Sequence, residues 1–422
     1  MASETTPTGP VMASDGLPLK RSLAVALRRQ KMRALMLIAP LLLFVLLTFI
    51  IPIGEMLLRS VDNKIVENTI PQTVIALRDW DESVDDVPGE AVFAAFYTDM
   101  LAAVEQKNHT RLGSRLNYEK PGLSSMFRRL GRSVEKFDPS LPLKEQFIDV
   151  DKKWAQPDNW QMIKLNSDPY TAGYFLASAD LTKTLDGIQR VDEDQRIYVK
   201  LFIRTLILSI TITATCIILG YPVAWLLANL RASSANLLMI LVLLPFWTSL
   251  LVRTSAWKVL LQQQGVINDL LVWVGLITDE NRLVMINNQT GTIIAMTHIL
   301  LPFMILPLYS VMKTIPPTYL RAAKSLGATN WTAFWRVYFP QSIPGIGAGS
   351  ILVFILAIGY YITPELVGGT QGTFISNRIA YHISSSLNWG LAAALGASLL
   401  VIVMALYWTY DKIVGIDNVK LG

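Results

Sequence analysis

Long runs of apolar residues, each near the length of a membrane crossing, constrain this chain more than any other feature. About 20 apolar residues in a helix cross roughly 30 Å of hydrocarbon, and backbone groups in lipid must form hydrogen bonds within their own segment. We therefore predict an all-α, polytopic membrane protein with about six transmembrane helices. The predicted spans are Ala34–Leu58, Leu201–Leu230, Leu237–Leu251, Thr292–Met312, Ile346–Val367 and Gly390–Tyr410.

The basic residues beside these runs predict the orientation in the membrane. Positive charge gathers on the cytoplasmic side, so the basic cluster at 28–33 places the N-terminal segment 1–33 in the cytoplasm. Residues 1–20 are rich in Ser, Thr, Pro and Gly, which predicts a disordered tail. Six spans then give cytoplasmic loops near 231–236 and 313–345 and a cytoplasmic tail at 413–422. These segments and their borders contain Arg231, Lys313, Arg321, Lys324, Arg336, Lys412 and Lys420.

A cleaved signal peptide is the alternative explanation of the first apolar run. The run is too long for the apolar part of a signal peptide, and bulky Met56, Leu57 and Leu58 follow instead of a small-residue cleavage site. We therefore expect a membrane anchor at 34–58.

Residues 59–200 have the composition of a water-exposed region, whereas the chain as a whole is 52% hydrophobic and only 16% charged. Acidic residues outnumber basic ones in this segment, and the rest of the chain is basic, as expected of charge gathered at one membrane face rather than of a nucleic-acid-binding surface. Apolar residues recur with a helical period over 90–106, and 121–136 and 171–198 also favour helix. We predict a mostly helical extracytoplasmic insert. A helix at 257–274 is expected to lie at the outer membrane surface.

The predicted cytoplasmic loop 313–345 contains a pattern suited to docking another protein. Small Ala322 and Ala323 allow a short helix to approach a partner closely, and Gly327 can adopt the left-handed conformation that ends a helix. Thr329 or Asn330 can cap a following helix. Its aromatic residues Trp331, Phe334, Trp335 and Tyr338 would share one face, and Pro340 and Pro344 are expected to break the helix before the next span.

This loop resembles the coupling motif of binding-protein-dependent ABC importer permeases, in which Glu-Ala-Ala is followed at fixed spacing by Gly and by Ile-x-Leu-Pro. Ala322, Ala323, Gly327 and Pro340 match at the family spacing, while Arg321 replaces the usual glutamate. The resemblance implies a permease core at 201–412 that is coupled to two ATP-binding subunits. It also implies a second permease subunit and a periplasmic substrate-binding protein as partners. The residues that it assigns to coupling are Arg321, Ala322, Ala323, Gly327, Trp331, Phe334, Trp335 and Pro340.

Three further segments resemble the spermidine/putrescine (polyamine) branch of this family: 220–225, 244–248 with 252–254, and 361–369. The resemblance implies import of a polyamine or a related organic cation across the bacterial inner membrane. A carboxylate with aromatic neighbours can hold a cationic amine, so Glu365 beside Tyr360, Tyr361 and Thr363 is a candidate contact. Trp247 and Thr248, beside Pro245, are further candidates for the substrate path.

Nothing in the sequence predicts catalysis by this chain. The phosphate-binding Gly-x4-Gly-Lys pattern does not occur, and His109, His298 and His382 lack metal-ligand spacing, so we expect no metal and no cofactor, with ATP bound by partner subunits. His298 is expected to form a hydrogen bond with a neighbouring helix. Two alternatives remain. A sensor would fit the large insert but lacks a predicted output domain, and an ion-driven secondary transporter would be expected to show internal repeats and paired intramembrane charges.

Overall fold

The computed structural model describes residues 19–81, 85–184 and 187–414, and the predicted tails before 19 and after 414 lie outside the described residues. The chain divides into two compact units, Met1–Leu58 and Arg59–Gly422, which are described separately here.

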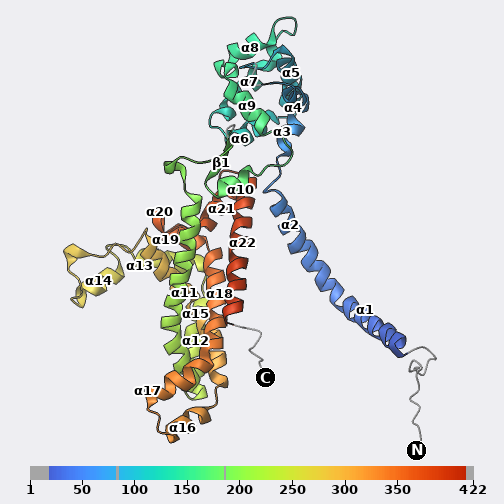
Figure 1. The fold of residues 1–422 in the computed structure, drawn as a ribbon. Coiled ribbons are helices and arrows are strands. Elements are labelled where there is room, and N and C mark those ends of the chain that lie inside the picture. The colour runs from blue at the N-terminus through green and yellow to red at the C-terminus, as the bar shows by residue number, and fades with distance from the viewer. Residues whose placement is uncertain (1–18, 82–84, 185–186, 415–422) are drawn as a thin grey trace, which may run out of the picture. The chain divides into compact units, whose positions relative to one another are not determined.

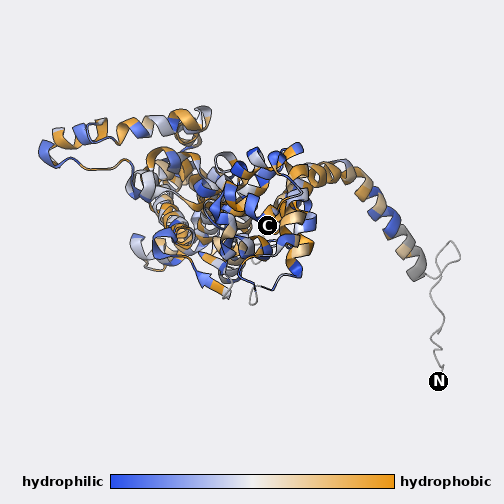
Figure 2. Ribbon diagram, turned by 90° about the horizontal axis from the view of Figure 1, so that it is seen from above, coloured by the Kyte–Doolittle hydropathy of each residue, from blue (hydrophilic) through white to orange (hydrophobic). Residues whose placement is uncertain are grey.

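The N-terminal unit is one long apolar helix with a local irregularity. It contains α1 (Leu19–Val45), the π-helical turn η1 (Leu46–Ile50) and α2 (Ile51–Leu58). Its stretch Leu27–Leu58 has a mean hydropathy of 3.0 in its most apolar part, and none of that part is buried. Figure 2 shows the apolar colour along this helix and a hydrophilic stretch toward its N-terminal end. The helix begins well before Ala34 because Leu, Arg, Lys and Ala are good helix formers.

The region that follows is a bundle of short helices, at the top of Figure 1. The predicted helix at 90–106 is confirmed as α5. The elements are α3 (Lys64–Thr69), α4 (Pro71–Arg78), α5 (Glu90–Glu105), α6 (His109–Asn117), α7 (Leu123–Ser133), η2 (Val134–Lys136), α8 (Leu143–Val150), η3 (Lys152–Ala155), α9 (Pro157–Leu165) and α10 (Gly173–Ser178).

Aromatic side chains fill the core of this bundle. Phe96 on α5 lies 5.1 Å from Trp154 and 5.3 Å from Phe147, measured between ring centroids. Phe93 packs against Trp160 at 4.8 Å. All five rings are fully buried. The insert therefore buries its large apolar residues against one another, as a water-soluble domain does.

The prediction of helix over 171–198 is wrong for its second half. After α10 the chain forms an antiparallel hairpin of β1 (Leu181–Thr184) and β2 (Gly187–Arg190), followed by the 3-10 turn η4 (Glu193–Gln195). Gly187 has a φ of +110°, a left-handed value that favours glycine and suits a tight hairpin turn.

Asp180 fixes the exit from this hairpin. Its carboxylate accepts hydrogen bonds from the backbone N–H groups of Ile197, Tyr198 and Val199 at 2.9–3.2 Å. These are the unpaired donors at the start of a helix, so the side chain caps α11 (Tyr198–Asn229) across the hairpin. The insert and the first helix of the membrane region are thereby joined rigidly.

The membrane region consists of long helices joined by shorter ones. Its elements after α11 are α12 (Ala232–Leu243), η5 (Leu244–Trp247), α13 (Leu250–Leu260), α14 (Val266–Trp273), η6 (Asp279–Asn281), α15 (Gln289–Thr314), α16 (Pro317–Ser325), α17 (Asn330–Ala333), the π-helical η7 (Phe334–Tyr338), α18 (Phe339–Gly359), α19 (Ile362–Val367), α20 (Gly369–Gly372), α21 (Ile375–Ser384) and α22 (Trp389–Val414).

Within the described residues, five helices are long and apolar enough to cross a membrane, or six if the bent pair α12–η5 and α13 counts as one span. The prediction of an all-α polytopic protein is thereby confirmed. The bend of that pair is 94° and follows Pro245, after which Thr248 and Ser249 have extended backbone. The single helix predicted at 257–274 is wrong, because α13 ends at Leu260 and α14 begins at Val266.

Glycines allow the central helix α15 to pack closely against α11 and α18. A Cβ at Gly345 would lie 3.0 Å from Val311 Cβ and 3.2 Å from Leu308 Cα. A Cβ at Gly349 or at Gly220 would likewise lie close to the Met304 side chain. Small residues at helix contacts are the usual means by which membrane helices approach each other. The span predicted at Ile346–Val367 is displaced, since one continuous helix runs from Asn330 to Gly359.

The insert packs directly on the end of the membrane region where α22 begins. A Cβ at Gly390, at the start of α22, would collide with the Tyr174 ring of α10. Ser178 and Ser398 share a hydrogen bond of 3.2 Å, and the Tyr118 hydroxyl donates to the Ser386 carbonyl at 2.7 Å. These contacts explain why residues from 59 onward form a single compact unit.

Candidate functional site

The loop between α15 and α18 forms an exposed elbow at the end of the molecule opposite the insert (Figure 1). Its first helix, α16 (Pro317–Ser325), is followed two residues later by Gly327, whose φ of +87° is the left-handed value expected after a helix end. The Thr329 hydroxyl accepts a hydrogen bond from the Thr332 N–H at 3.2 Å and so caps α17. Arg321 and Ala322 are exposed, Ala323 is half-buried, and Leu326 is 89% exposed. The elbow thus presents a small-residue surface with an apolar tip.

Aromatic rings connect this elbow to the membrane helices. Trp331, 72% exposed, packs on Trp335 with 5.6 Å between ring centroids. Phe334 contacts Trp335 at 5.3 Å and Tyr221 of α11 at 6.2 Å. Tyr338, only 4% exposed, ends the row. The predicted aromatic face is confirmed, and it leads from solvent into the core.

Pro340 and Pro344 do not break the helix, contrary to the sequence prediction. The chain instead widens into the π-helical turn η7, in which the Phe339 N–H donates to the Phe334 carbonyl five residues earlier. A proline within a helix lacks the N–H that would bond to the residue four positions before it. The π-helical turn accommodates that loss, so α17, η7 and α18 form one continuous helix of 30 residues. A displacement of α17 would therefore be transmitted along α18.

The other candidate residues lie at breaks between helices of the membrane region or close to such breaks. Trp247 and Thr248 are exposed at the bend between α12 and α13. Tyr361 is exposed and Tyr360 half-buried at the break between α18 and α19. Thr363 is fully buried, and its hydroxyl shares a hydrogen bond of 3.1 Å with that of Thr254. In this conformation Thr363 joins α13 to α19 and does not face an open path.

Glu365 lies in a polar cavity of about 600 Å³ between the end of the insert, the start of α11 and α21. Its carboxylate accepts a hydrogen bond from Asn377 Nδ2 at 2.6 Å. The lining includes three acidic and four basic side chains, so the cavity alone does not select a cation. The charged residues are Glu193, Asp194, Glu365, Arg196, Lys200, Arg204 and Arg378.

Arg253 on α13 is a residue whose position the sequence did not reveal. Its Nε and Nη1 atoms are buried and have no hydrogen-bond partner among the described residues. Leaving a guanidinium buried without acceptors is costly. On the same helix, Trp257 Nε1 donates to His298 Nδ1 at 3.1 Å, so the predicted hydrogen bond of His298 with a neighbouring helix is confirmed. For Arg253, the only sequence feature that could have pointed to a buried charge is its position within an apolar segment.

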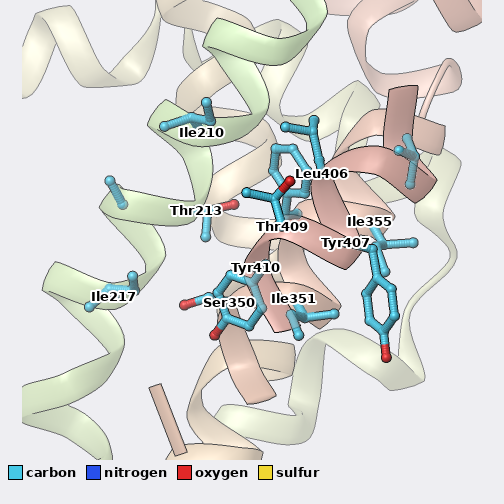
Figure 3. Close-up of a pocket in the computed structure, with 13 residues that line it drawn as sticks. Ile210, Thr213, Ile217, Ser350, Ile351, Ile355, Leu406, Tyr407, Thr409 and Tyr410 are labelled. Carbon is cyan, nitrogen blue, oxygen red and sulfur yellow. The ribbon is translucent and has the colours of Figure 1, made fainter. Parts of the chain in front are cut away.

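A second cavity, of about 400 Å³, is a groove between α11, α18 and α22 (Figure 3). Ile210, Ile217, Ile351 and Leu406 point into it, with a few hydroxyl groups at its edges. Such a lining suits acyl chains or another apolar helix, and it does not suit a polar solute.

Comparison with known proteins accounts for this arrangement. Residues 196–414 match the family model described as "Binding-protein-dependent transport system inner membrane component". The spermidine/putrescine transport system permease protein PotB of Salmonella typhimurium (strain SL1344) is 33% identical over 233 residues, which cover 54% of this chain and 80% of that protein. The inner membrane ABC transporter permease protein YdcU of Escherichia coli (strain K12) is 35% identical over 225 residues, 51% of this chain and 71% of that protein.

Among solved structures, a bacterial alginate ABC transporter in complex with alginate pentasaccharide-bound periplasmic protein contains a similar chain. The TM-score is 0.43 at 18% identity, with 52% of this chain and 78% of that chain covered.

The matched residues begin just before α11 and end at the last residue of α22. They include the elbow with its aromatic row, whereas most of the insert lies outside them. A permease of this family takes its solute from a binding protein. This excludes the two alternatives, a sensor and an ion-driven secondary transporter. The chain belongs to the family of inner membrane components of binding-protein-dependent transport systems, the permeases of ABC importers.

Proposed function

We propose that this permease imports a polyamine such as spermidine or putrescine, or a related organic cation. We infer the solute class from the 33% identity with PotB over 233 residues. The cavity around Glu365 adds no selectivity of its own, because side chains of both signs line it. The solute class therefore rests on likeness in the permease core.

The working transporter consists of this chain, a second permease subunit, two ATP-binding subunits and a periplasmic substrate-binding protein. The ATP-binding subunits bind and hydrolyse ATP, and this chain contributes no cofactor or metal. Both of its termini face the cytoplasm, which leaves the elbow on the cytoplasmic side and the insert outside. The match of residues 196–414 to the family model supports an assembly of several components.

Coupling to ATP passes through the elbow at 316–340. Exposed Arg321, Ala322 and Trp331 meet the ATP-binding subunit, while Gly327 sets the angle between α16 and α17. The row of rings and the continuous helix 330–359 transmit the movement toward the break between α18 and α19. A rigid link of this kind is what alternating access requires, since a displacement must reach the solute path without being absorbed by a flexible loop.

Replacement of the exposed tryptophan of the elbow tests this assignment. Trp331→Ala removes a ring that packs on Trp335 without touching the buried core. We expect transport by the assembled complex to fall by about tenfold or more, since a central aromatic anchor commonly contributes at least 2 kcal/mol to an interface. The measurement is uptake of radiolabelled spermidine into proteoliposomes that contain the complete transporter.

Trp408→Ala is the matched control, because Trp408 is also an exposed tryptophan but lies on α22, away from the elbow. Its transport should stay close to that of the parent protein. Equal loss in both variants, or no loss in Trp331→Ala, would remove the elbow from the coupling pathway.

Glu365 is the candidate contact for the cationic solute, together with Tyr360, Tyr361, Trp247 and Thr248. Glu365→Gln keeps the hydrogen-bonding shape and removes the charge. We expect the half-saturating spermidine concentration to rise by about tenfold, in keeping with the loss of one charge-assisted contact. Asp194→Asn, in the same cavity, is the control and should leave it unchanged. If both variants behave alike, Glu365 is not a solute contact.

A further inference from the structure

We propose that a phosphate-type oxyanion binds where the insert meets the outer end of α22. A cavity of about 560 Å³ opens there, lined by α6, by Arg128 of α7 and by residues 386–390. This site is separate from the cavity around Glu365 and from the elbow, and it does not depend on the solute of the transporter.

One face of α6 supplies most of the polar lining. Arg111, Ser114, Arg115 and Tyr118 follow the spacing i, i+3, i+4 and i+7, which places them on the same side of a helix. Arg128 joins them from α7, the antiparallel partner of α6. Three guanidinium groups therefore line one small cavity.

Arg115 is nine-tenths or more buried and incompletely paired. Only 5% of it is exposed; its Nε donates to Asn63 Oδ1 at 2.9 Å and its Nη1 to Glu119 Oε1 at 2.7 Å. Its Nη2 is buried without a hydrogen-bond partner among the described residues. A buried donor that lacks an acceptor is destabilising, so an acceptor oxygen at this place would stabilise the fold.

The charged residues that line this cavity are all basic, although Glu119 and Asp62 are close enough to act on Tyr174. No aspartate or glutamate is among the lining residues, and the only ion pair recorded for the three arginines in the described part of the chain is that of Arg115 with Glu119. Tyr174, over which the Arg115 guanidinium stacks at 4.7 Å, stays neutral because burial raises its pKa to about 12. By contrast, neighbouring Arg129 is paired with Asp151. Three arginines around one cavity, two of them without a recorded ion pair in the described part of the chain, favour an anion.

The planar fork of arginine matches phosphate oxygens in particular, since it can donate two parallel hydrogen bonds. Exposed Leu387 and Trp389 border the cavity at the first residues of α22, a span whose ends lie at membrane–water interfaces. Two sources of the oxyanion fit this position: the headgroup of an anionic phospholipid and free phosphate. In either case the ligand would join the insert to α22.

The test compares phosphate and lipid binding by the full chain and by charge variants. Arg111→Gln combined with Arg128→Gln removes two exposed guanidinium groups and leaves buried Arg115 in place, so the fold is retained. Arg132→Gln is the matched control, because Arg132 is exposed one turn further along α7 and does not line the cavity. Binding is measured by titration with radiolabelled inorganic phosphate in phosphatidylcholine nanodiscs and by the melting temperature in nanodiscs with and without phosphatidylglycerol.

We expect the parent protein and Arg132→Gln to bind alike and the double variant to bind about tenfold or more weakly. Saturable phosphate binding in phosphatidylcholine would identify free phosphate as the source. A rise in melting temperature with phosphatidylglycerol alone would identify a lipid headgroup. The proposal is overturned if neither ligand acts or if the double variant responds as the control does.

Discussion

The insert and the membrane region contain similar apolar residues but place them in opposite ways. In the insert, Phe93, Phe96 and Trp154 are fully buried among other rings. In the membrane region, apolar side chains such as Ile218 (70% exposed) and Val401 (68% exposed) point outward from α11 and α22. The insert therefore gains its stability by removing apolar surface from water, whereas the spans keep such surface for lipid or for partner subunits.

The same contrast applies to how helices are held together. Large rings fill the gaps between the short helices of the insert, whereas glycines bring α18 against the backbone of α15 and α11 against its side chains. Substitutions that create a cavity should therefore destabilise the insert most, and substitutions that add volume should destabilise the membrane region most. The predictions below test that difference, from the largest effect to the smallest.

Phe96→Ala should be the most damaging of these substitutions. The ring contacts Phe127, Phe147, Trp154 and Trp160, and its loss would leave a cavity that costs about 3–5 kcal/mol. We expect the insert to become sensitive to protease while the membrane helices stay protected. Limited proteolysis with mass identification of the fragments measures both at once. Ile218→Ala, on an outward face, should leave the protease pattern unchanged, and equal sensitivity in the two variants would contradict the contrast.

Gly345→Ala should destabilise the membrane region by about 1–3 kcal/mol, because the added methyl group meets the backbone of α15. Gly396→Ala on α22 is the control, since a Cβ there has nothing within 4 Å. Thermal unfolding of the detergent-solubilised protein, followed by the near-ultraviolet signal, compares the two. A lower melting temperature only in Gly345→Ala is expected, and a larger effect of Gly396→Ala would show that α15 and α18 do not pack as described.

Acid should weaken the contact between α21 and the start of α11 by a smaller amount. His382 is buried on α21, with hydrogen bonds to Tyr198 and Ser386. Burial and the nearby Arg378 lower the pKa of His382 from 6.5 to about 4. Because the folded state disfavours the proton, this stability is fully present above pH 6.5 and is lost as the pH falls toward 4.

His382→Gln isolates this contribution. The melting temperature of the parent protein should fall between pH 6.5 and pH 4 more steeply than that of the variant. Parallel pH profiles would mean that His382 does not resist protonation in the folded protein.

Sequence reasoning succeeded where local pattern determines structure. The helical period predicted α5, the Gly327–Thr329 pair predicted the turn and cap of the elbow, and apolar length predicted the spans. It failed at Pro340, because a π-helical turn can absorb a proline that would otherwise end a helix. The hairpin at 181–190 was missed although an Asp-Gly pair, a strong turn signal, precedes β2.

Contacts between distant segments could not be predicted from the sequence. The capping of α11 by Asp180, the approach of Tyr118 to Ser386 and the burial of Arg253 depend on tertiary placement that no local pattern contains. The arginine face of α6 was visible as a helical spacing, but its cavity exists only because the residues before α22 lie opposite it.

Purification of the tagged chain from its native membrane in mild detergent, with quantitative mass spectrometry of the proteins that copurify, tests the central claim most directly. The account predicts a second permease in near-equal amount together with an ATP-binding subunit, and a cross-link from Ser325→Cys in α16 to that subunit. A stable chain that carries no ATP-binding subunit, even after cross-linking at the elbow, would contradict it.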